Sequence, residues 1–183
     1  MPGVRWDQLF EVAVNQHGFV TTRDAVSLGL PRSYLGKMKA RGAIEGVSYG
    51  LYRFPQVPVT EYTPFMEAVL WVGQDAVLSH DAVLSLFGLA NANPNVIRVS
   101  TPRRVRRSDP PAAIEIIRRT LPDADQTVYE AIPSTTVARA LLDCRGLVMQ
   151  SRLVEAAHEA VVEGLVRRRD IAGLLEQLEH ADG

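Results

Sequence analysis

The chain has 183 residues, of which 46% are hydrophobic and 22% charged, and its formal net charge is −1. This ordinary balance excludes a disordered or fibrous chain, and the length is enough for one large core or two small ones. The single cysteine, Cys144, cannot form an internal disulfide, and no apolar run approaches the roughly 18 residues of a membrane span. We therefore expect a cytoplasmic protein with no membrane partner.

Charge is distributed unevenly along the chain. Residues 1–55 carry seven basic and four acidic side chains, a net of +3, whereas residues 121–183 carry six basic and eleven acidic ones, a net of −5. Both lysines of the chain, Lys37 and Lys39, lie in the basic part. Because an electrostatic footprint is a local property, the near-neutral total does not count against nucleic-acid binding by the first third of the chain.

Two short helices are expected at the start of the chain. Apolar residues recur at helical spacing between Trp6 and Gln16, and Gly18 follows as a stop. The segment Thr21-Thr-Arg-Asp24 has the form of a capping box, so a second helix should begin there and end at Gly29.

A third helix is expected to open at Pro31, because proline is favoured at the first helical position. Leu35 and Met38 lie three residues apart and should both face the core, which turns a small and cationic face outward. That outward face comprises Arg32, Ser33, Gly36, Lys37 and Ala40. It is either a solvated helix face or a surface that approaches DNA, where Ser33 and Lys37 would reach a base edge or a phosphate.

Residues 43–54 contain two short apolar runs around a Gly-containing turn, which predicts a β-hairpin. Tyr49, Gly50 and Arg53 are candidates for contacts to the DNA backbone or minor groove, whereas Tyr52 and Phe54 should pack on the first helix. Three helices followed by such a wing are typical of a winged helix-turn-helix, and we predict this DNA-binding domain to span residues 1–57. The candidate DNA-binding residues are Arg32, Ser33, Tyr34, Lys37, Lys39, Arg41, Tyr49 and Arg53.

Residues 58–183 are predicted to form a second domain of mixed α/β structure, which makes the whole chain an α+β protein. Helices are expected over 63–72, from an N-cap at Ser79 to residue 89, and over 134–143, 151–164 and 169–179, and strands over 96–100, 114–118 and 127–131. Between the first two strands lies a basic loop with Arg103, Arg104, Arg106 and Arg107. This loop is either a solvated connection or an extension of a nucleic-acid surface.

The sequence contains no convincing catalytic motif. Adjacent residues on a helix point about 100° apart, so His80 and Asp81 cannot act together, and we interpret His80 as a packed or capping residue. The segment Asp123-Ala-Asp125 lacks the Gly-Ser turn of nucleotidyl transfer and is interpreted as a solvated turn. A metal nuclease would need a lysine after its acidic pair, but none follows Lys39. We expect no enzymatic activity, cofactor or metal; magnesium-dependent cutting of DNA would overturn this.

Four further segments form an ordered set of motifs, namely Ala76–His80, Leu86–Leu89, Val99–Arg104 and Ile132–Asp143. Their order and spacing resemble the AbiEi antitoxins, which belong to abortive-infection toxin-antitoxin operons. The resemblance covers nearly the whole chain. It implies an N-terminal module that binds the operator and represses its own operon, with the DNA role on Ser33, Tyr34, Lys37 and the wing from Tyr49 to Arg53. It also implies that the C-terminal part opposes a nucleotidyltransferase toxin.

The resemblance thus implies operator DNA and a cognate toxin as partners, with a possible dimer on the DNA. Glu155, Glu159 and Glu163 recur every four residues and form an acidic stripe. This stripe is either solvated or docks a basic toxin, although antitoxins of this kind are usually classed as acting without a stable complex. The alternative function is a stand-alone transcriptional regulator whose second domain senses a ligand or a protein. A nucleotidyltransferase gene immediately downstream would separate the two.

Overall fold

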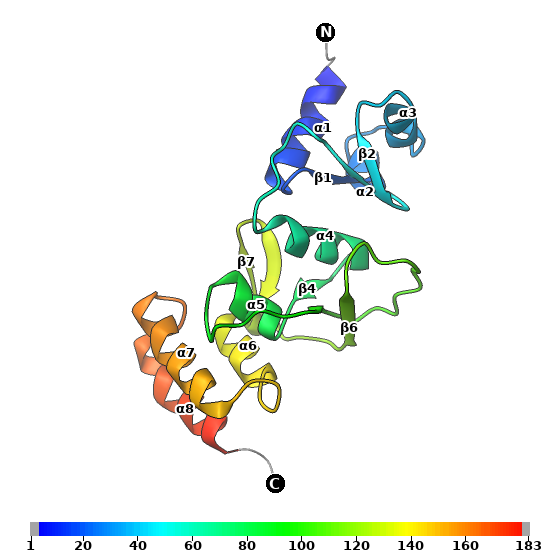
Figure 1. Cartoon of the computed structure of the whole chain (residues 1–183). Coiled ribbons are helices and arrows are strands. Elements are labelled where there is room, and N and C mark those ends of the chain that lie inside the picture. The colour runs from blue at the N-terminus through cyan, green and yellow to red at the C-terminus, as the bar shows by residue number, and fades with distance from the viewer. Residues whose placement is uncertain (1–3, 181–183) are drawn as a thin grey trace.

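The computed structural model describes residues 4–180. Its N-terminal part is a winged helix-turn-helix, with three helices and a small sheet (Figure 1). The elements are α1 (Val4–Asn15), β1 (Phe19–Thr21), α2 (Thr22–Ser27), α3 (Tyr34–Ala40), β2 (Glu45–Ser48) and β3 (Leu51–Arg53). The strands pair antiparallel in the order β1-β3-β2. The predicted helices and wing are therefore confirmed.

Local sequence signals explain how α2 begins. The Thr21 side chain accepts a hydrogen bond from the backbone of Asp24, and the Asp24 carboxylate accepts one from the backbone of Thr21 at 2.7 Å. This capping box satisfies two amide groups that would otherwise lack partners at the helix start. The predicted start of the second helix is thus confirmed.

Two predictions in this part need correction. Phe19–Thr21 forms β1, which was not expected, because three residues give too short a run to show an alternating pattern. In addition, α3 begins at Tyr34 and not at Pro31, so Arg32 and Ser33 lie in the turn before the helix. Ser33 occupies the N-cap position but makes no capping hydrogen bond with its side chain.

The smaller of two hydrophobic cores holds the winged helix together. Leu9, Leu35 and Phe54 are fully buried in it. The Phe54 ring packs in edge-to-face pairs with Trp6 and Phe10 of α1, with ring centres 5.0 and 5.5 Å apart. The predicted packing of Phe54 on the first helix is confirmed.

The remaining residues build a five-stranded sheet with helices packed around it. Its elements are α4 (Thr63–Val72), β4 (Val77–Leu78), α5 (Asp81–Leu86), β5 (Ile97–Thr101), β6 (Ile114–Arg118), β7 (Gln126–Tyr129), β8 (Ile132–Thr135), α6 (Val137–Asp143), α7 (Gln150–Val162) and α8 (Ile171–Glu179). The strand order is β6-β5-β4-β8-β7. The β5–β6 and β4–β8 pairs are parallel, and the other two are antiparallel. This mixed sheet with helices confirms the predicted α+β class.

Here too the boundaries differ from the predictions in places. The N-cap of α5 is His80 and not Ser79, since the chain is still leaving β4 at Ser79. The segment that begins at Ile132 first forms β8, which pairs with both β4 and β7, and the helix α6 starts only after Thr136. Helical periodicity in α6 masked this short strand, because four residues fit either pattern.

The two parts of the molecule are packed against each other. Phe19 and Leu51, from the small sheet, belong to the larger hydrophobic core together with Met66 and Leu78. The His17 ring nitrogen Nε2 lies 2.7 Å from the carbonyl oxygen of Glu130. The junction is thus apolar in its interior and hydrogen-bonded at its surface.

Within residues 4–180, no helix is both long enough and apolar enough to cross a membrane.

Candidate nucleic-acid interface

Helix α3 presents the outward face that its sequence predicts. Leu35 and Met38 are buried in the smaller core, whereas Gly36, Lys37 and Ala40 are exposed. Arg32 and Ser33 are also exposed, in the turn that leads into the helix. The spacing of Leu35 and Met38 therefore fixes which side of α3 is free to meet a partner.

The other candidates on α3 differ in their surroundings. Tyr34 is half-buried and packs against the smaller core, so its ring supports the helix. Lys39 lies across Gly46 of the wing, where an added methyl group would come within 2.6 Å of its ammonium nitrogen. Arg41 is exposed at the C-cap. Lys37 is thus the lysine that projects from α3 without a neighbouring strand beneath it.

The wing ends in an exposed aromatic residue. Tyr49 is 96% exposed at the tip of the hairpin, and Gly50 follows with a φ of 75°, a conformation that favours glycine. The carbonyl oxygen of Gly50 accepts a hydrogen bond from the backbone of Thr22 at 2.9 Å. The wing tip is therefore held to the first turn of α2.

Arg53 lies at the base of the wing, where most of its side chain is covered. Its side chain is only 15% exposed, and its Nη2 donates a hydrogen bond to the carbonyl oxygen of Val57 at 2.6 Å. Its Nη1 also lies 3.8 Å from the Glu45 carboxylate. Nη1 and Nη2 thus face groups of the protein, whereas Nε is buried and has no hydrogen-bond partner among the described residues. The DNA contact expected of Arg53 stays a prediction.

The remaining cations of this part are free of acidic partners. Within residues 4–180, none of the following makes an ion pair: Arg23, Arg32, Lys37, Lys39 and Arg41. Unpaired and exposed cations on one module attract an anionic polymer without first breaking internal contacts.

A groove beside the wing extends this surface. It has a volume of about 710 Å³ and is lined by Arg23 of α2, Arg32, and Tyr49 and Gly50 of the wing. Its far wall includes Arg107, from the loop between β5 and β6. The sequence shows that this loop is basic but does not place it beside the wing, since Arg107 and Tyr49 are 58 positions apart in the chain.

A second polar cluster surrounds His80. Its Nδ1 lies 3.0 Å from the Ser79 hydroxyl and 3.9 Å from the Asp143 carboxylate, so the same ring nitrogen faces both groups. In a catalytic triad, one ring nitrogen of the histidine faces the nucleophile and the other faces the carboxylate. Ser79 is also fully buried and accepts a hydrogen bond from Ser100. This arrangement is that of a packed histidine, as predicted.

The electrostatics of His80 agree with such packing. Burial lowers the pKa of His80 below its usual 6.5, and the neighbouring Arg119 and Arg98 lower it further, although Asp143 and Asp81 act in the opposite direction. Asp81 does not pair with His80, because its carboxylate accepts a hydrogen bond from Arg98 at 2.7 Å. The ring is therefore mainly neutral near pH 7.

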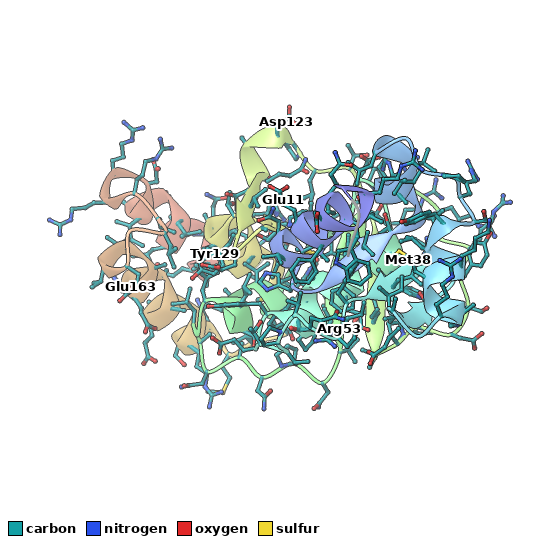
Figure 2. All side chains as sticks on the ribbon, turned by 90° about the horizontal axis from the view of Figure 1, so that it is seen from above. Glu11, Met38, Arg53, Asp123, Tyr129 and Glu163 are labelled. Atoms are coloured by element: carbon teal, nitrogen blue, oxygen red, sulfur yellow. The ribbon has the colours of Figure 1, made fainter. Side chains whose placement is uncertain are left out.

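The acidic stripe lies far from α3. Glu155, Glu159 and Glu163 are exposed on α7 and its C-cap, and within the described residues none of them forms an ion pair. Figure 2 shows Met38 of α3 and Glu163 at opposite ends of the molecule. The basic and acidic surfaces are thus separate, as the charge distribution along the sequence indicates.

The N-terminal part of the chain matches a known protein family. Residues 7–55 match a family model described as transcriptional regulator, AbiEi antitoxin. This match confirms, for the winged helix, the resemblance seen in the sequence. No curated protein shows a significant sequence match to the chain.

Three chains among the solved structures are similar to this fold. One is the crystal structure of the RV2827C protein from Mycobacterium tuberculosis, with a TM-score of 0.50 and 14% sequence identity. The alignment covers 98% of this chain and 78% of that one. At this identity the similarity shows a shared fold and nothing about function.

Proposed function

Because residues 7–55 match the family of AbiEi transcriptional-regulator antitoxins, we propose that this chain is a bacterial antitoxin that also represses its own operon. Residues 1–57 form its operator-binding domain, and residues 58–183 oppose a nucleotidyltransferase toxin encoded beside it. The protein acts in the cytoplasm, with two copies on one operator. The observation that carries the proposal is the family match, which supports an antitoxin and regulatory role.

The geometry of the winged helix supports the DNA-binding half. A recognition helix needs an exposed face of small and cationic residues, so that its backbone can approach the groove. On α3 that face consists of Gly36, Lys37 and Ala40, preceded by Arg32 and Ser33. Tyr49 at the tip of the wing is free to contact the backbone of the same duplex.

The acidic stripe supports direct contact with the toxin. A protein that transfers nucleotides to nucleic acid needs a basic cleft, and an exposed acidic face would complement such a cleft. Glu155, Glu159 and Glu163 offer three carboxylates on one side of α7 and its C-cap, and none of them forms an ion pair with another residue of the range 4–180. Their distance from α3 would allow one molecule to hold DNA and toxin together (Figure 2).

A titration of labelled upstream DNA tests the DNA-binding half. The purified protein is added to DNA from its own upstream region and to a scrambled duplex, and fluorescence anisotropy is measured at several salt concentrations. We expect tighter binding to the upstream DNA at every salt concentration. Equal affinity for the two duplexes, or no binding, would overturn the repressor proposal.

Co-expression tests the antitoxin half. Cells that express the neighbouring nucleotidyltransferase should stop growing, and growth should resume when this protein is made as well. Glu176→Lys, an exposed position on α8, should leave operator binding and rescue unchanged and serves as a positive control. Failure of the wild-type protein to restore growth would overturn the antitoxin assignment.

The family match also leaves room for a second function, since it ends at residue 55. The alternative is a stand-alone transcriptional regulator whose C-terminal domain senses a ligand or a protein. It predicts operator binding without rescue from any toxin, and a genome position with no nucleotidyltransferase gene downstream.

A further inference from the structure

The connection between β5 and β6 brings a cluster of arginines to the wing. We call residues 102–113 the arginine arm; it carries Arg103, Arg104, Arg106 and Arg107, all of them exposed. The Arg107 Nη1 donates a hydrogen bond to the carbonyl oxygen of Tyr49 at 3.5 Å, across 58 positions of the sequence. We propose that the arm is a second DNA-contacting element, which binds backbone phosphates of the duplex beside the segment that α3 reads.

The fold explains why the arm reaches so far. Strands β5 and β6 are parallel neighbours, with Ile97 opposite Ile114, so the chain between them must return along the whole length of these two strands. In Figure 1 this connection projects on the same side of the molecule as α3 and the wing. A tight turn could not have carried its arginines to that side.

Arg103 and Val105 anchor the base of the arm. The Arg103 Nε donates a hydrogen bond to the Asp75 carboxylate at 2.7 Å, and Val105 packs against the larger core. Within the described residues, Arg104, Arg106 and Arg107 form no ion pair. Three guanidinium groups are thus held on a short, anchored segment without an acidic partner.

Arginines from three separate elements meet around the groove beside the wing. Arg23 comes from α2, Arg32 from the turn before α3, and Arg107 from the arm. Asp24 also lines the groove, but its carboxylate already accepts hydrogen bonds from Thr21 and Gln16. Three of the four charged side chains that line the groove therefore carry guanidinium groups, which match phosphate oxygens in geometry and charge.

Duplex DNA suits this surface because the arm continues the surface of the winged helix. A B-form duplex carries a negative charge about every 1.7 Å of its axis. Each cation of a protein surface that follows the duplex can therefore add to the binding affinity. A duplex in contact with α3 and Tyr49 would pass the groove next. The inference rests on the proposed operator binding, since the arm needs the duplex that α3 positions.

Salt dependence of binding tests the arm directly. We compare the full-length wild type with the triple variant Arg104→Ala, Arg106→Ala, Arg107→Ala in anisotropy titrations against upstream and scrambled duplexes. Each phosphate contact contributes about 0.9 to the slope of log affinity against log salt, so the variant should lose about two to three units of slope. Its preference for upstream over scrambled DNA should remain, because backbone contacts carry no sequence information.

A matched control removes the same charge elsewhere. The triple variant Arg167→Ala, Arg168→Ala, Arg169→Ala changes three consecutive exposed arginines that precede α8, at the other end of the molecule from α3. Its slope should equal that of the wild type. A third variant with lysine at positions 104, 106 and 107 keeps the charge and should restore most of the slope, and unchanged thermal unfolding would show that all variants fold.

The outcomes separate this inference from the proposed function. If the wild type binds upstream DNA and the arm variant shows the same salt slope, the proposed role of the arm is wrong, while the repressor proposal still stands. The same would follow if both arginine triplets changed the slope equally, because total charge would then explain the effect. A wild type that binds no duplex would overturn the repressor proposal and the arm together.

Discussion

Arg119 donates hydrogen bonds to both carboxylate oxygens of Asp143, and this ion pair joins the residue after β6 to the last residue of α6. Asp143 is 2% exposed, and its Oδ1 also accepts a hydrogen bond from the Arg139 Nε at 2.8 Å. Arg119 in turn donates to the Ser100 hydroxyl of β5 at 2.9 Å. One buried carboxylate thus connects a helix with two strands of the sheet.

Replacing Asp143 by asparagine should destabilise the protein strongly. The amide removes the charge that two arginines share, and removing one partner of a buried ion pair costs about 3 kcal/mol or more. Urea unfolding followed by circular dichroism measures the change. Asp123→Asn, at an exposed position, should shift the free energy of unfolding by less than about 0.5 kcal/mol. Equal stability of the two variants would contradict the role of Asp143.

The protein should also lose stability in acid, in two ranges. Burial alone would raise the pKa of Asp143, but the hydrogen bonds from Arg119 and Arg139 outweigh burial and hold it below its usual 3.8. The ionised Asp143 carboxylate therefore contributes to the stability of the fold above pH 3.8, and this contribution is lost as the pH falls below that value. The lowered pKa of His80 makes the folded state favour the neutral ring, so stability already declines as the pH falls below 6.5.

His80→Asn separates the two ranges, since asparagine does not titrate and tolerates the positive φ of 57° at this position better than most residues. The urea concentration at the midpoint of unfolding should then depend less on pH just below 6.5, while the steeper loss of stability below pH 3.8 remains. An unchanged pH profile would mean that His80 does not contribute to the upper range.

Cys144 should be chemically inert in the folded protein. It is fully buried, and burial, together with the charges of Asp81 and Asp143, raises the pKa of its thiol to about 12. The thiolate is the reactive form, so a thiol reagent at pH 8 should modify Cys144 of the folded protein only as fast as the protein unfolds locally around it. In urea-unfolded protein the same reagent should modify Cys144 at once. Rapid modification without urea would show that the larger core opens readily around α6.

Lys37→Ala should weaken operator binding by the loss of one phosphate contact. We expect the salt slope to fall by about one unit. Arg152→Ala, which removes one exposed charge from α7, is the control and should leave the slope unchanged. A wild-type slope in the Lys37 variant would exclude this side chain from the interface.

Glu159→Lys should abolish toxin neutralisation if the acidic stripe docks the toxin. The reversed charge would repel a basic cleft, while the distant α3 would still bind operator DNA. Rescue of growth and DNA affinity are measured for this variant and for Glu176→Lys, which makes the same change on α8. Full rescue by both variants would exclude the stripe as a toxin-docking surface.

The features that sequence analysis predicted correctly are those set by neighbours in the chain. The capping box of Thr21 and Asp24 spans four residues, and the spacing of Leu35 and Met38 determines the outward face of α3 without reference to the rest of the fold. The basic and acidic ends could be found by counting charges. Such signals gave the winged helix, its exposed face and the α+β class.

What sequence analysis missed depends on contacts between distant residues. Strand β1 exists because Phe19–Thr21 pairs with β3, some thirty residues later. The contacts of Arg53 with Val57 and Glu45 could not be predicted, because they depend on how the hairpin and the segment after it fold together. The nearness of Arg107 to Tyr49 follows from the parallel pairing of β5 and β6, which nothing in the local sequence indicates.

The apolar junction makes the two halves of the molecule dependent on each other for survival in the cell. Phe19 and Leu51 complete the larger core, so a fragment that ended near residue 57 would leave both uncovered and would be prone to aggregate. Conversely, a mutation that loosens the sheet around Met66 or Leu78 would also loosen the winged helix. If the proposed function holds, such a mutation would derepress the operon and disarm the antitoxin in a single step, so that toxin synthesis would rise as protection is lost.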